Sequence, residues 1–137
     1  VAVRFIGNIK NPVYGGRRKL RETLAGRAEF VLARKQRAYW NLLRSSQALI
    51  CPTENQYGDY IPGKILEYLA AGAAVLTNCD LAGYGWPDLQ ECVIPYRDID
   101  DLNSKLSMDF SPWYERAFDA LAAHTHRVRY TELFSRM

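Results

Sequence analysis

The sequence has few cysteines, and their spacing excludes two common uses of this residue. The three present, Cys51, Cys79 and Cys92, are odd in number, and their spacing fits neither a disulfide framework nor a zinc-binding pair. We therefore expect them to be small, reduced residues of the hydrophobic core in a cytoplasmic protein.

The sequence also lacks long hydrophobic runs and strong charge of one sign. The longest apolar stretch, residues 66–76, is interrupted by Glu67 and Gly72 and is far shorter than a membrane-spanning segment. A net charge of +3 gives no reason to expect a nucleic-acid partner. The two histidines, His124 and His126, would point to different sides of a helix, so no metal site is expected.

Short apolar runs alternate with helical patterns, an order typical of a parallel sheet covered by helices. We expect strands at residues 1–7, 29–33, 48–51, 74–77 and 92–95. We expect helices at residues 17–25, 36–46, from Pro62 to a cap at Gly72, 98–106 and 112–134. The predicted fold over residues 1–137 is one α/β domain: a doubly wound (Rossmann-like) five-stranded parallel sheet with helices on both faces and a helical C-terminus.

Ligands of such sheets bind outside the carboxyl ends of the strands, so the loops that follow strands are the candidate sites. Three such loops are expected, at residues 8–18, 53–62 and 78–86. No glycine pattern of dinucleotide-binding proteins and no phosphate-binding loop of ATPases occurs in them.

The second loop leads into a helix that carries charged residues at its start. Asp59 precedes this helix, and Lys64 and Glu67 lie three residues apart on one of its faces. A carboxylate there can accept hydrogen bonds from a ribose diol, while a lysine and free helix N–H groups can hold a diphosphate. The alternative is a solvated Lys64–Glu67 surface pair.

The first loop combines small residues with a basic helix start. Gly7 and Asn8 follow the first expected strand, and Arg17 and Arg18 open the next helix, where they can bind phosphate oxygens. A basic first turn opposes the helix macrodipole unless an anion binds there. The alternative is a solvated helix end. Tyr60, within the segment from Asp59 to Glu67, is assigned to the donor site as a residue that can stack on a ligand.

The run DYIPGKILEYLAAGAAV, residues 59–75, resembles the donor-site signature of group-1 glycosyltransferases of the GT-B fold. In that signature two acidic residues are separated by seven others, and here they are Asp59, where Glu is usual, and Glu67. The resemblance implies that Glu67 holds the donor ribose and that Asp59 lies near the donor sugar as a catalytic residue. Lys64 occupies a position that is commonly basic in the spore-coat-like branch of the group.

Weaker similarity to this branch extends over nearly the whole chain, at residues 5–8, 93–102 and 124–129. Residues 54–64 are also similar to the GDP-fucose-binding stretch of fucosyltransferases, in which an arginine after the first strand grips the diphosphate. Arg17 or Arg18 matches that role.

The resemblance implies a hexosyltransferase, retaining and free of metal and cofactor, that uses a UDP- or GDP-sugar. The acceptor would be held by an N-terminal domain that precedes this chain, so the chain alone is expected to bind donor without transferring it. Peripheral association of the full enzyme with a membrane is compatible with this expectation. Two alternatives stay open: an inverting fucosyltransferase-type enzyme that uses GDP-fucose, and a non-catalytic doubly wound module that binds a regulator or a partner.

Overall fold

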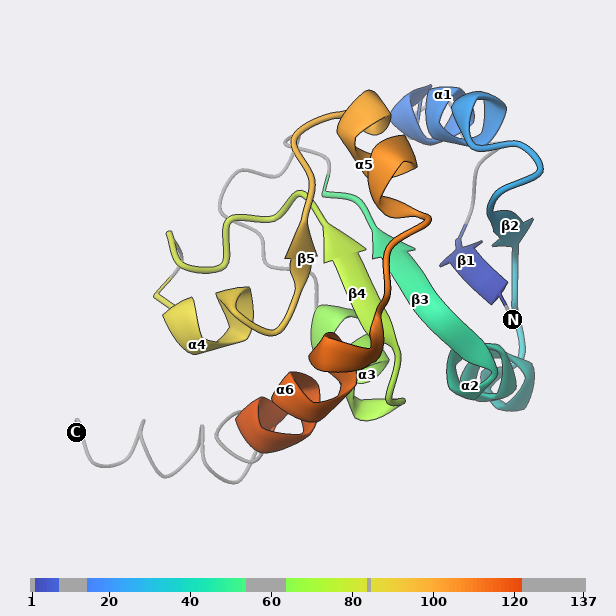
Figure 1. The fold of residues 1–137 in the computed structure, drawn as a ribbon. Helices are drawn as coiled ribbons and strands as arrows, with labels where there is room; N and C mark the ends of the chain where they lie inside the picture. Colours follow the sequence, from blue (N-terminus) through green and yellow to red (C-terminus); the bar gives the residue numbers. More distant parts are fainter. Residues whose placement is uncertain (1, 8–14, 54–63, 84, 122–137) are drawn as a thin grey trace.

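The structure, a computed structural model, describes residues 2–7, 15–53, 64–83 and 85–121 (Figure 1). Its centre is a five-stranded sheet in the order β2-β1-β3-β4-β5, and every pair of neighbouring strands is parallel. The strands are β1 (Ala2–Ile6), β2 (Glu29–Val31), β3 (Ser46–Cys51), β4 (Ala74–Thr77) and β5 (Ile94–Pro95). The predicted α/β doubly wound fold with a parallel sheet is confirmed.

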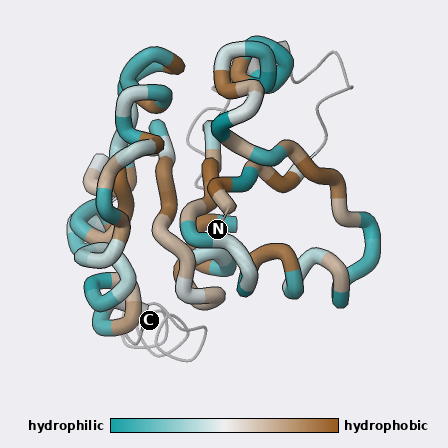
Figure 2. The backbone as a smooth tube through the Cα atoms, turned by 45° about the vertical axis from the view of Figure 1, so that its right-hand side comes forward, coloured by the Kyte–Doolittle hydropathy of each residue, from teal (hydrophilic) through white to brown (hydrophobic). Residues whose placement is uncertain are grey.

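The two central strands are buried on both faces, as parallel strands covered by helices must be. All four residues of β4 are buried, and so are five of the six residues of β3. The strands pair in register from Ala48 opposite Ala74 to Cys51 opposite Thr77. Figure 2 shows the result as a brown, hydrophobic interior between hydrophilic outer turns.

Helices cover both faces of the sheet through two separate apolar clusters. Leu20 of α1 (Gly15–Thr23) and Leu102 of α5 (Ile99–Lys105) belong to the cluster on one face. Leu43 of α2 (Gln36–Arg44), Leu69 of α3 (Lys64–Ala70) and Leu89 of α4 (Pro87–Gln90) belong to the cluster on the other. The C-terminal helix α6 (Ser111–Leu121) contacts α3 and β4. This arrangement confirms helices on both faces and a helical segment after the last strand.

The helical spacing of apolar residues predicts that Ile65, Leu66, Leu69 and Ala70 form the buried face of helix α3. In the structure Ile65, Tyr68 and Leu69 are each about 1% exposed, whereas Ala70 is exposed. Tyr68 is buried in place of Ala70 because it lies one turn after Ile65 and its ring supplies far more apolar area than a methyl group. Gly72 ends the helix at φ +85° and donates to the carbonyl of Leu69, as the predicted cap requires.

Several predicted boundaries differ from the structure by a few residues. Helix α4 was not predicted, because four residues with one buried leucine give no helical period. Strand β3 begins at Ser46 rather than at residue 48, because polar residues occupy its first two positions. The predicted helix at 112–134 is described only as far as Leu121, and Pro62, His124 and His126 lie outside the described residues.

The three cysteines are all buried and free, as predicted. Burial raises the pKa of each thiol, and that of Cys51 rises to about 12. The thiols therefore stay protonated and serve as small apolar packing groups.

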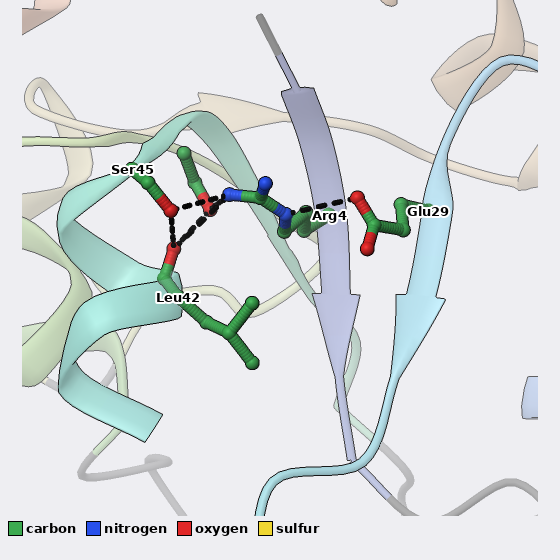
Figure 3. A network of polar contacts seen from close by, with 5 residues as sticks. Arg4, Glu29, Leu42 and Ser45 are labelled. Carbon is green, nitrogen blue, oxygen red and sulfur yellow. Dashed lines mark hydrogen bonds and ion pairs between the residues drawn. The ribbon is translucent and has the colours of Figure 1, made fainter. Parts of the chain in front are cut away.

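Near the amino-terminal ends of the strands, one arginine links three strands and a helix (Figure 3). The side chain of Arg4, 14% exposed, donates to a carboxylate oxygen of Glu29 at 3.1 Å. It also donates to the carbonyl of Leu42 at 3.3 Å and to the hydroxyls of Ser45 and Ser46, each at 2.9 Å. β1, β2, the end of α2 and the start of β3 are thus held by a single guanidinium group.

We expect Arg4→Ala to lower the free energy of unfolding by about 2 kcal/mol, because it removes several hydrogen bonds to a charged group. Urea unfolding of the two proteins measures the difference. Arg97→Ala is the matched control, since the Arg97 side chain is 87% exposed and reaches Asp101 only at 3.8 Å. Equal losses in the two variants would show that the Arg4 network adds no stability.

Candidate functional site

From β1 the chain leads to β2 on one side, and from β3 it leads to β4 on the other side. The direction of connection therefore reverses between β1 and β3. The chain leaves β1 for α1 on one face of the sheet and leaves β3 for α3 on the other face. In doubly wound sheets the crevice between two such connections, at the carboxyl ends of the strands, is where ligands bind. The carboxyl ends of β1 and β3 are therefore the candidate site.

Gly7 and Arg17 are neighbours at the end of β1. Its N–H donates to the carbonyl of Val31 at 3.0 Å, which fixes the chain just after the strand. A Cβ atom at Gly7 would lie 3.3 Å from the ring of Phe5 and 3.4 Å from a guanidinium nitrogen of Arg17. The Arg17 guanidinium lies over the Phe5 ring, 5.4 Å from its centroid. The small residue and the cation, both predicted for the site, are thus close neighbours.

The structure also brings together the cations of the first and second predicted loops. Burial raises the pKa of Cys51, at the end of β3, and the positive charges of Lys64 and Arg17 act in the opposite direction. Arg17 likewise lowers the pKa of Tyr68, which burial raises. Arg17 on α1 and Lys64 at the start of α3 therefore both lie within electrostatic reach of the end of β3. Arg18 is exposed in the first turn of α1, next to Arg17.

Glu67 lies one turn into α3 and is exposed. Its Oε2 atom accepts a hydrogen bond from the hydroxyl of Tyr39 on α2 at 2.7 Å. Tyr39 was not predicted as a residue of the site. The only signal was the residue type, since a partly buried tyrosine usually has a hydrogen-bond partner for its hydroxyl.

Hydrogen bonds join the start of the third predicted loop to the end of β3 and the residues that follow it. The buried hydroxyl of Thr77 donates to the carbonyl of Cys51 at 2.7 Å and accepts from the N–H of Cys79 at 3.1 Å. The side-chain oxygen of Asn78 accepts from the N–H of Thr53 at 2.6 Å and from its hydroxyl at 2.8 Å. These bonds tie the first residues after β3 to the first residues after β4.

Charge is unevenly distributed along the chain. The described residues up to position 53 include ten Lys and Arg against two Glu, and those from position 64 onward include four against ten Asp and Glu. The first part therefore carries a net charge of +8 and the second one of −6. Helix α1, with four basic residues against one Glu, belongs to the positive part and can attract an anion.

Three residues assigned to the site, Asn8, Asp59 and Tyr60, lie outside the described residues. In the part that is described, no group of three or more His, Cys, Asp or Glu side chains could hold a metal ion. None of the helices in this same part has the length and hydrophobicity to cross a membrane.

No protein-family model matches the chain, and no curated protein is significantly similar to it. The site geometry and the resemblance of residues 59–75 are therefore the basis for a functional proposal.

Proposed function

We propose that the chain is the nucleotide-sugar-binding domain of a glycosyltransferase. The proposal is supported by the charges of Arg17 and Lys64, which both act on the Cys51 thiol at the end of β3, and by the exposed carboxylate of Glu67 in the first turn of α3. Two cations and one exposed carboxylate are the groups that a nucleoside diphosphate needs, since its phosphates are anionic and its ribose offers a pair of hydroxyl donors. The resemblance of the Asp59–Glu67 segment to a donor-site signature gives the same assignment.

Each side chain has a separate role in this proposal. Glu67 accepts hydrogen bonds from the two ribose hydroxyls, because an ionised carboxylate has acceptor positions on both oxygens. Arg17 offers a planar, two-pronged set of donors to phosphate oxygens, and Lys64 contributes a point charge. Gly7 lies next to Arg17 at the end of β1. Arg18, Asn8 and Tyr60 complete the proposed set of donor-binding residues.

We also propose a transfer reaction, on the basis of the resemblance to group-1 glycosyltransferases. Retention of configuration, independence of metals and a role for Asp59 beside the donor sugar are properties of the similar group. A second domain would hold the acceptor, so this chain binds donor and does not transfer it alone. In the absence of a metal, cationic side chains would neutralise the charge that develops on the leaving diphosphate.

Thermal unfolding with nucleotides tests the proposal. We expect UDP or GDP at millimolar concentration to raise the melting temperature, because a ligand at one hundred times its Kd stabilises the folded state by about 2.7 kcal/mol. Inorganic phosphate at the same concentration is the control and should give a much smaller shift. Preference for GDP over UDP would favour a fucosyltransferase-type donor. A folded sample that responds to no nucleoside diphosphate would support the non-catalytic module instead.

A further inference from the structure

The carboxylate assigned to the ribose is held by a neutral partner from another helix. Glu67 accepts from Tyr39 at 2.7 Å, and among the described residues it forms no ion pair with a cation. An arginine partner would occupy both carboxylate oxygens through a two-pronged bond. A tyrosine occupies one acceptor position on Oε2 and leaves Oε1 and the remaining positions available for a ligand.

Tyr39 is itself fixed in place. It is partly buried against the apolar cluster that contains Tyr68 and Leu69 of α3. Its ring meets that of Trp40 edge to face, with centroids 5.8 Å apart and planes at 73°. A ring with two rotatable bonds that is packed in this way places its hydroxyl accurately.

Tyr39 also stays a donor at every physiological pH. Burial and the hydrogen bond to Glu67 both raise its pKa above the ordinary value for tyrosine. The hydroxyl of the buried Tyr68 is close enough to contribute in the same direction. The proton therefore stays on the Tyr39 oxygen, which donates it in the hydrogen bond to the carboxylate.

We propose that Tyr39 is a positioning residue that holds the Glu67 carboxylate in the orientation needed to accept both hydroxyls of the donor ribose. The consequence is selectivity for ribonucleoside over deoxyribonucleoside diphosphates. A free glutamate side chain must lose rotamer freedom when it binds a diol. The bond from Tyr39 restricts that freedom before the nucleotide arrives, which is the general way in which preorganisation raises affinity. This inference rests on the proposed function, since it concerns the same carboxylate.

The test compares Tyr39→Phe with the unchanged chain for UDP, GDP and their 2′,3′-dideoxy analogues, with Kd measured by calorimetry. The unchanged chain should bind the ribonucleotide more tightly than the dideoxy analogue. Tyr39→Phe should weaken binding of the ribonucleotide about tenfold, the size expected for a hydrogen bond to a charged group. It should leave the Kd of the dideoxy analogue unchanged, a result that general damage to the fold could not produce.

Two further variants complete the design. Tyr114→Phe is the matched control, because the Tyr114 hydroxyl donates to the carbonyl of Gln47 at the amino end of β3, away from the proposed site. It should change neither Kd. In a Glu67→Gln background, Tyr39→Phe should lose most of its effect, as coupled residues do in a double-mutant cycle.

The outcomes separate the two proposals. Binding of neither diphosphate by the unchanged chain would overturn the proposed function, and the role of Tyr39 with it. Selective binding of ribonucleotides that survives Tyr39→Phe would overturn the positioning role alone. Equal weakening for ribo- and dideoxynucleotides would show that Tyr39 supports the fold rather than Glu67.

Discussion

Glu67→Ala abolishes the stabilisation of the chain by UDP or GDP and changes its free energy of unfolding by less than about 1 kcal/mol. This is the expected result because Glu67 is exposed and its hydrogen-bond partner, the Tyr39 hydroxyl, is only partly buried. Removal of the carboxylate exposes that hydroxyl to water and opens no cavity. The ribose loses its acceptor, and the affinity falls too far for UDP or GDP at millimolar concentration to stabilise the folded state.

Thermal melts with and without nucleotide, together with urea unfolding, measure both quantities on the same samples. Glu115→Ala on α6 is a suitable control, since this glutamate is also exposed and lies on another helix. It should keep the full nucleotide response. Unfolding of the Glu67→Ala protein would identify Glu67 as a structural residue and remove it from the site.

Leu69→Ala, on the buried side of the same helix, should have the opposite effects: a large loss of stability and no loss of nucleotide binding by the folded chain. Leu69 is 1% exposed and belongs to the cluster that joins α2, α3 and α4 to the sheet. Truncation of a fully buried leucine costs about 3 kcal/mol, because apolar contacts are lost and a cavity remains. That loss is a large part of the stability of a domain of this size. We expect a markedly lower urea midpoint, with nucleotide still bound wherever the chain is folded.

Leu32→Ala is the matched substitution at an exposed position, since Leu32 is 49% exposed. Its cost should stay below about 1 kcal/mol. If the two leucines cost the same, α3 is not packed as the structure describes, and the orientation of Glu67 would have to be reconsidered.

The strands of the sheet could be predicted because a buried parallel strand requires a short apolar run, which is visible in the local sequence. Each strand is a short apolar run, and a helical period follows most of them. The order β2-β1-β3-β4-β5 could not be obtained in this way, because it depends on which strands pair over long separations. Helix α4 left too short a pattern to be detected.

The same distinction holds for the site. Arg17 and Lys64 were predicted because each lies at a strand-to-helix connection, and the fold rule brings such connections together. Tyr39 was not predicted, because its partner Glu67 lies 28 positions away on another helix. The spacing of residues within α2 cannot predict a contact with another helix. Only the packing of α2 beside α3 places the hydroxyl against the carboxylate.

The basic first turns of α1, which contain Arg17, Arg18 and Lys19, would act on a nucleotide before it touches the protein. A nucleotide carrying two or more negative charges would be drawn toward this helix from a distance. Such attraction acts on the rate of encounter and weakens once the salt shortens the Debye length to about 8 Å. The proposed site would therefore bind its donor more slowly as the salt concentration rises.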